Sequence, residues 1–207
     1  MLWEFIITTY AGVFFLIFAM NIVPVLMPPT WIVLSTLYFL FPQQFSLIPL
    51  VVLGAFASTL GRVILCRIGT LSRRIMSDER KRSMETAGKA LKSTKYGGFV
   101  MTFIYALSPL PSNAYFLTMG TMKCHFFSIF LGFWLGRLVS YSITTAAANT
   151  VFTSLASVFT SQILAVALLD SLALGSMIVF LFIDWEKLLH ERRLAFVRPQ
   201  LFQRKPS

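Results

Sequence analysis

Two arginines lie inside long apolar stretches of the chain, where a cation needs a polar or anionic partner. Arg62 and Arg137 each end a Leu-Gly-Arg triplet. A guanidinium forms two parallel hydrogen bonds to phosphate oxygens, so both arginines are candidates for binding a phosphate headgroup. For Arg137 the alternative is an ion pair with Asp170, which lies in the next apolar stretch. Both interpretations of Arg137 are open from the sequence.

Short polar side chains surround a second feature, the prolines Pro109 and Pro111. Ser108, Ser112 and Asn113 are their polar neighbours in an otherwise apolar region. Proline lacks a backbone donor and disfavours helix at the residue before it, so a straight spanning helix is not expected here. The hydroxyls and the amide can either cap the broken helix or contact a ligand headgroup, and both roles are open.

A similar break precedes the first arginine. Pro28 and Pro29 introduce an apolar run over residues 30–41. About twenty residues are needed to cross the hydrocarbon core of a bilayer, so this shorter run predicts a re-entrant element. In lipid, backbone groups freed by proline need protein or water around them, and such breaks are typical of substrate sites. Pro28 and Pro29 are therefore candidate residues of the same binding site.

The composition places the chain among integral membrane proteins. Of its 207 residues, 57% are hydrophobic and 13% are charged, and the mean hydropathy is +0.75. The formal charge of +10 comes from 18 Lys and Arg against 8 Asp and Glu, and most basic residues lie in two blocks, 73–95 and 187–205. Such blocks face the cytoplasm and bind anionic lipid headgroups. No base-reading motif accompanies them, so nucleic acid is not an expected partner.

The sequence carries no cofactor or catalytic signature. The two cysteines do not form a CxxC pair, and the two histidines are far apart. No nucleophile elbow and no phosphate-cradling loop is present. We therefore expect no metal, no cofactor and no enzyme activity.

The apolar stretches predict an all-α membrane protein with about four full transmembrane helices. These helices are expected at residues 2–21, 46–68, 126–148 and 162–185. Both basic blocks lie on one side of the membrane if each proline-broken element enters and leaves through one face. The two re-entrant hairpins then enter from opposite faces, as in an inverted repeat, and both termini are cytoplasmic.

The chain divides into two halves joined by a basic segment. The predicted units are a first half, a cytoplasmic loop, a second half and a cytoplasmic tail, at residues 1–69, 70–95, 96–186 and 187–207. For the loop, a solvated coil is favoured over a short surface helix. The small polar residues around 144–150 are expected to end the helix that begins at residue 126.

The order of these features resembles the DedA/VTT family of membrane proteins, also called SNARE-associated Golgi proteins. The resemblance covers approximately residues 21–141. It rests on the proline-containing first element, the Gly-rich helix before the basic loop, the run Ser-Pro-Leu-Pro-Ser-Asn at 108–113, and Met119-Gly120. It implies two opposed re-entrant hairpins that move lipids or polyprenyl-phosphate carriers between leaflets. Better-known members carry an acid where this chain has Arg62, which indicates a distant subgroup.

We expect a transporter or scramblase for phospholipid or polyprenyl-phosphate-type lipids, with membrane lipids as partners and an oligomer among the allowed assemblies. Two other classes are open: an ion- or proton-coupled small-solute transporter, and a scaffold that recruits partners through its basic segments. Few carboxylates lie in the apolar stretches, which disfavours ion coupling. The short loops favour a prokaryotic plasma membrane.

Overall fold

The described part of the chain is built from helices, which confirms the all-α prediction. The computed structural model describes residues 8–23, 27–93, 96–108, 112–122, 126–159 and 161–183. The elements found there are α2 (Tyr10–Ile22), α3 (Thr30–Leu40), α4 (Leu47–Ser72), the 3-10 helix η1 (Arg73–Ile75), α5 (Asp78–Ser93), α6 (Gly97–Leu107), α7 (Ser112–Thr121), α8 (Phe126–Phe159) and α9 (Gln162–Phe182).

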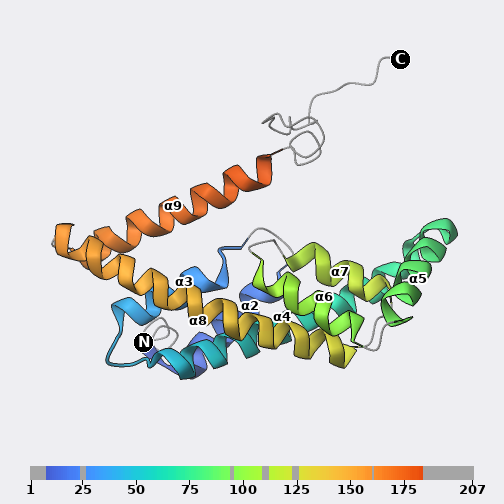
Figure 1. The fold of residues 1–207 in the computed structure, drawn as a ribbon, viewed down its shortest axis with the longest axis horizontal. Coiled ribbons are helices and arrows are strands. Elements are labelled where there is room, and N and C mark those ends of the chain that lie inside the picture. Colours follow the sequence, from blue (N-terminus) through green and yellow to red (C-terminus); the bar gives the residue numbers. More distant parts are fainter. Residues whose placement is uncertain are drawn as a thin grey trace, which may run out of the picture.

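Two long helices, α4 and α8, run side by side through the molecule in opposite directions (Figure 1). They contain 26 and 34 residues, or about 39 and 51 Å at a rise of about 1.5 Å per residue. The hydrocarbon core of a bilayer is about 30 Å thick. Both helices are long and apolar enough to cross it, which indicates a membrane-associated protein.

Two helix-break-helix segments pack on this pair from opposite ends. Figure 1 shows α2 and α3 towards one end of the bundle and α6 and α7 towards the other, with both breaks near the middle. Within each segment the first arm packs on the long helix of its own half, α2 on α4 and α6 on α8. The second arm packs on the long helix of the other half, α3 on α8 and α7 on α4. The halves are therefore interlocked.

The first arms of the two segments share a sequence pattern. Both contain Gly-x-Phe-x-x-x-Phe and reach a proline at the same distance from that glycine. The phenylalanines stack in the same way in each arm, with ring centroids 6.1 Å apart for Phe14 and Phe18 and 6.1 Å apart for Phe99 and Phe103. This match was not part of the sequence prediction, and it supports a duplication.

The two Leu-Gly-Arg triplets make equivalent contacts with the ends of these arms. A Cβ on Gly61 would stand 2.7 Å from the Cβ of Asn21, and a Cβ on Gly136 would stand 2.6 Å from the Cβ of Ala106. Asn21 and Ala106 both lie three residues before a proline. Any side chain larger than hydrogen would push the arm away, so glycine brings each following arginine next to a break.

The four predicted spans are confirmed in part. The two at residues 46–68 and 126–148 correspond to α4 and α8. The described part of the span predicted at 2–21 is α2, a helix of 13 residues, and the described part of the one at 162–185 is α9, with 21 residues. α9 packs on α8 and α3 near its start and then diverges from the bundle (Figure 1).

The prediction that polar residues around 144–150 end a helix was wrong. α8 continues to Phe159, because its hydroxyl groups bond within the helix. Thr144 donates to the carbonyl of Ser140 at 2.8 Å, and Thr150 donates to that of Ala146 at 3.2 Å. A hydroxyl that bonds the carbonyl four residues earlier is satisfied without breaking the helix.

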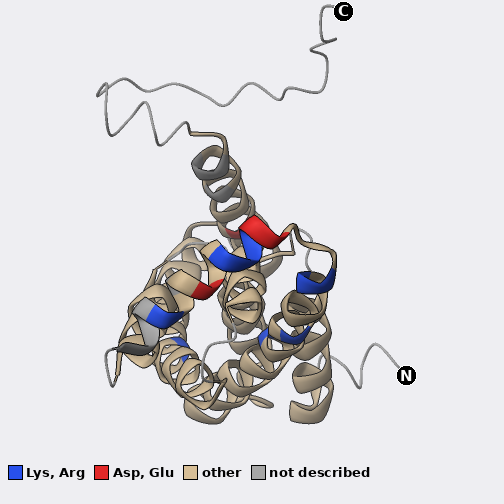
Figure 2. Ribbon diagram, turned by 90° about the vertical axis from the view of Figure 1, so that its right-hand side faces the viewer, with Lys and Arg blue, Asp and Glu red and all other residues tan. Residues whose placement is uncertain are grey.

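The favoured prediction of a coil between residues 70 and 95 was also wrong, since most of this segment is helical. Asp78 and Glu79 lie in the first turn of α5, where a negative charge stabilises the helix dipole. Lys81 forms an ion pair with Asp78 at 3.0 Å. In Figure 2, which looks at the end where α5 lies, acidic and basic residues follow one another along this helix.

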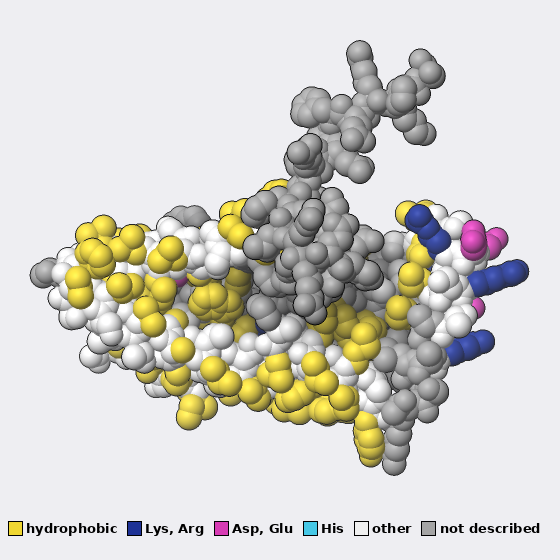
Figure 3. All heavy atoms as spheres, turned by 45° about the horizontal axis from the view of Figure 1, so that its top comes forward, with side chains coloured by type: hydrophobic (Ala, Val, Ile, Leu, Met, Phe, Trp, Pro, Cys, Tyr) yellow, Lys and Arg dark blue, Asp and Glu magenta, His cyan; other side chains and the backbone are white. Residues whose placement is uncertain are grey.

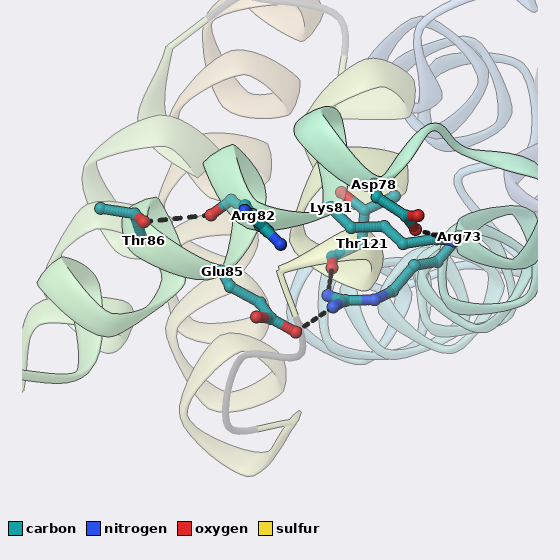
Figure 4. A network of polar contacts seen from close by, with 7 residues as sticks. All are labelled: Arg73, Asp78, Lys81, Arg82, Glu85, Thr86 and Thr121. Atoms are coloured by element: carbon teal, nitrogen blue, oxygen red, sulfur yellow. Dashed lines mark hydrogen bonds and ion pairs between the residues drawn. The ribbon is translucent and has the colours of Figure 1, made fainter.

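α5 is docked on the end of α7 through Arg73. The guanidinium of Arg73 donates to the carbonyl of Thr121 at 2.9 Å and forms an ion pair with Glu85 (Figure 4). Farther along α5, a Cβ on Gly88 would stand 2.5 Å from the carbonyl oxygen of Met122. Side chain and backbone contacts therefore connect the basic helix to the second broken segment.

Replacing Gly120 with alanine is expected to destabilise the protein by about 1–3 kcal/mol, as overpacking usually does. The added methyl group would collide with the carbonyl oxygen of Cys66, so α7 would have to move away from α4. Thermal unfolding in detergent measures the effect. Gly175→Ala is the matched control, because a Cβ there meets nothing within 4 Å. Equal losses of Tm in the two variants would contradict the prediction.

Arg73→Ala is expected to loosen α5 without unfolding the bundle, because it removes both polar contacts of the Arg73 side chain. Hydrogen exchange of the amides in residues 78–93 should accelerate about five- to tenfold. The acceleration is modest because Glu85 is half exposed, and an ion pair in contact with water contributes little to stability. Arg74 is exposed, and Arg74→Ala serves as the control. Unchanged exchange in Arg73→Ala would show that α5 is held by its backbone contacts alone.

Candidate functional site

The tips of the two broken segments are joined by Arg62. From α4, its Nη1 donates to the main-chain carbonyl of Asn21 at 3.3 Å, and also to the side-chain carbonyl of Asn113. Asn21 lies in the last turn of α2, the first arm of the first segment, and Asn113 lies in the first turn of α7, the second arm of the second segment. Arg62 and Asn113 are both candidate site residues from the sequence, and the structure brings them into contact.

Asn21 is a buried amide that closes the first break. It is 3% exposed, and its Nδ2 donates to the carbonyl of Ile17 at 2.8 Å and to the hydroxyl of Thr30 at 3.0 Å. Thr30 begins α3, so the amide connects the two arms across the prolines. Sequence reasoning missed Asn21, although a lone amide in an apolar run shortly before a proline is a usable signal.

The second break is closed by aromatic and hydroxyl groups. The hydroxyls of Thr102 and Tyr115 lie 2.6 Å apart, and the rings of Tyr105 and Tyr115 stack with centroids 4.3 Å apart. Thr102 and Tyr105 belong to α6, and Tyr115 belongs to α7. The two arms are therefore held in a fixed relation near Arg62.

Arg137 lies over two aromatic rings of its own helix. Its Cζ is 4.9 Å from the ring centroid of Phe133 and 5.4 Å from that of Tyr141. Tyr141 is 2% exposed, and its hydroxyl is 3.2 Å from that of Ser58 on α4. The cation is thus supported by π faces rather than by a carboxylate. Tyr141 follows Arg137 by four residues, a spacing that places both on one helix face.

Asp170 is not the partner of Arg137. Its Oδ2 accepts a hydrogen bond of 2.9 Å from the hydroxyl of Thr36 on α3, and among the described residues no ion pair joins it to Arg137. Of the two interpretations left open by the sequence, the ion pair is therefore not formed. Asp170 instead attaches α9 to the second arm of the first broken segment.

The two guanidiniums form one electropositive centre. Arg62 and Arg137 are close enough for their positive charges to repel each other. The Nε atoms of both arginines are buried without a hydrogen-bond acceptor in the described part of the protein. A buried donor without an acceptor is unfavourable. The described residues thus present excess positive charge and unused donors at this point.

The remaining predicted site residues have local roles where they are described. The hydroxyl of Ser108 donates to the carbonyl of Tyr105 at 2.8 Å, which agrees with the capping interpretation. Ser112 is 3% exposed and begins α7. Pro29 precedes the first turn of α3, where its carbonyl accepts from the amide of Ile32 at 3.0 Å.

The other three predicted positions are prolines. Pro28 is exposed just before α3. Pro109 and Pro111 lie outside the described residues. The two broken segments are instead joined through described neighbours of these prolines, Asn21 and Asn113, which both bind Arg62.

Comparison with protein-family models, with curated proteins and with solved structures finds no match. The resemblance to the DedA/VTT family accordingly stays a prediction.

Asn21→Ala is expected to destabilise the protein by about 1–3 kcal/mol, because Thr30 loses its buried partner and the two arms of the first segment lose their connection. Thermal unfolding in detergent reports the loss. Ser142→Ala is the control, since the Ser142 hydroxyl is exposed and, within the described part of the protein, bonds to Leu138 of its own helix alone. A change in Tm no larger than that of the control would show that Asn21 does not stabilise the first break.

Proposed function

We propose that this chain is a multi-pass membrane protein that moves phospholipid or polyprenyl-phosphate-type lipids between leaflets. The observation that carries the proposal is the electropositive centre of Arg62 and Arg137 beside the junction of the two broken segments. A cation pair without a neighbouring carboxylate among the described residues suits a ligand that brings its own negative charge. A lipid phosphate reaches this depth with its acyl chains still in an apolar environment.

In the proposed topology the two broken segments are re-entrant hairpins that enter from opposite faces of the membrane. α4 and α8 cross the membrane between them, and α9 adds a further crossing. α2 is then an arm of the first hairpin rather than the full span expected at residues 2–21, so the start of α2 and the end of α9 lie on opposite faces instead of both on the cytoplasmic one. The opposite directions of α4 and α8, and the matching contacts of α2 with α4 and of α6 with α8, support an inverted repeat. The basic helix α5 then lies at the cytoplasmic surface next to anionic headgroups.

The outer surface supports contact with lipid tails. Large hydrophobic side chains are exposed on α2, α4, α6 and α8, among them Phe15, Ile48, Ile104 and Phe127, which are between 61% and 75% exposed. Figure 3 shows such side chains spread over the flank, while charged side chains gather at the end where α5 lies. Soluble monomers rarely expose contiguous apolar surface on this scale.

The direct test is lipid exchange in liposomes that contain the purified protein and a fluorescent phospholipid. A membrane-impermeant reductant quenches label in the outer leaflet only, so protein-dependent loss of the remaining label reports movement between leaflets. We expect quenching to proceed beyond the level of protein-free liposomes for at least one anionic headgroup. Quenching equal to that of protein-free liposomes for anionic and zwitterionic lipids alike would sink the proposal.

A pH gradient across the same liposomes separates this proposal from a proton-coupled transporter. Lipid exchange through an uncoupled path should proceed at equal rates with and without the gradient. Asp170→Asn is the matched variant, because Asp170 is the carboxylate found on the described apolar helices. A rate that depends on the gradient, and loses that dependence in Asp170→Asn, would favour coupling instead.

A further inference from the structure

The arginines of the two Leu-Gly-Arg triplets occupy equivalent places but have different partners. In each half the glycine touches the end of a first arm, Asn21 in α2 and Ala106 in α6. The following arginine therefore starts from the same position relative to its break. What each guanidinium meets there is set by the other residues around it.

The guanidinium of Arg62 binds acceptors within the protein itself. Its Nη1 binds one acceptor from each broken segment, the carbonyl of Asn21 and the amide oxygen of Asn113. The Asn21 carbonyl lies at the C-terminal end of α2, where a helix leaves its last carbonyls without partners. A guanidinium at that point satisfies an orphan acceptor and joins two elements that come from opposite ends of the bundle.

Arg137 has no such acceptors. Among the described residues it forms no hydrogen bond, and its contacts are the rings of Phe133 and Tyr141. Ala106 is the residue equivalent to Asn21 in its own half, and its main-chain carbonyl accepts no hydrogen bond from Arg137, although the structure describes both residues. A ring face stabilises the charge but does not accept the guanidinium N–H groups in their own plane. The in-plane N–H groups of the Arg137 guanidinium are therefore available to an anion.

Among the residues that the structure describes, no carboxylate pairs with the guanidinium of Arg137. The carboxylate of Asp170 is bound by Thr36, and Arg62 adds a second positive charge next to Arg137. An anion at Arg137 would relieve the repulsion between the two cations and supply the missing acceptors. The local electrostatics thus favour a bound anion at the second arginine and a protein-protein bond at the first.

We infer that the duplicated arginines have divided their roles. Arg62 is a positioning residue that holds the tips of the two broken segments together, and Arg137 determines headgroup specificity by binding the negative charge. This inference rests on the proposed function for its lipid ligand, and the division of roles goes beyond that proposal. It predicts that the two arginines respond to different measurements.

The test compares Arg137→Gln with Asn113→Ala in the liposome assay, using labelled phosphatidylserine and phosphatidylcholine. Arg137→Gln should lower the ratio of anionic to zwitterionic exchange about tenfold, because a charge-assisted pair is lost. Its Tm in detergent should change by no more than the Tm of Ser142→Ala does. Asn113→Ala should lower Tm and slow both lipids equally, leaving the ratio unchanged. Arg137→Lys keeps the positive charge without the planar guanidinium and should give an intermediate ratio.

An unchanged ratio in Arg137→Gln, or an equal fall of the ratio in Asn113→Ala, would overturn the division of roles. Arg62→Gln provides a second measurement: a lower ratio with an unchanged Tm would assign specificity to Arg62 and also overturn it. These outcomes concern selectivity, which a purely structural role does not alter.

Absence of exchange by the wild-type protein would refute the proposed function, and binding would then decide the inference separately. The probe is short-chain phosphatidic acid added in detergent, with short-chain phosphatidylcholine as control. Stabilisation by the acid that is lost in Arg137→Gln and kept in Asn113→Ala would support anion binding at Arg137. No stabilisation of the wild-type protein by the acid would overturn it.

Discussion

The arrangement of the whole bundle depends on how a guanidinium is satisfied among apolar helices. Arg62 meets this requirement by donating to Asn21 and Asn113. Short helices are marginal on their own and need tertiary contacts to persist. α2, α3, α6 and α7 have between 10 and 13 residues, so each depends on its neighbours. One cation in α4 gives two of them a common polar anchor.

Close packing is what brings that anchor into place. Gly61 and Gly136 allow the ends of α2 and α6 to touch the long helices, while Gly69 and Gly120 bring the backbones of α4 and α7 together. Small residues permit such approach in bundles where lipid replaces water as the solvent. Position and chemistry are thus linked in each Leu-Gly-Arg triplet, because the glycine sets how far the next guanidinium stands from the break.

The sequence was sufficient for the helical class, the two breaks and the repeated triplets, and it singled out Arg62 and Asn113, which the structure brings into contact. These features can be predicted because prolines, apolar runs and lone cations affect the chain close to their own positions in the sequence. It was not sufficient for the length of α8 or for α5, where hydroxyl back-bonding and local ion pairs override composition. It also could not assign Asp170, because its partner Thr36 lies on a distant segment whose orientation depends on tertiary packing.

In the proposed topology, the length of α8 has a consequence for the surrounding bilayer. Its 34 residues exceed the hydrocarbon thickness by about 20 Å when the helix stands upright. An overlong apolar helix is accommodated by tilting, by kinking or by thickening the lipid around it. Because α8 contacts α3, α4, α6 and α9, a change in its tilt would carry all four along. Bilayer thickness would then act as a mechanical input that sets the angle between the two interlocked halves.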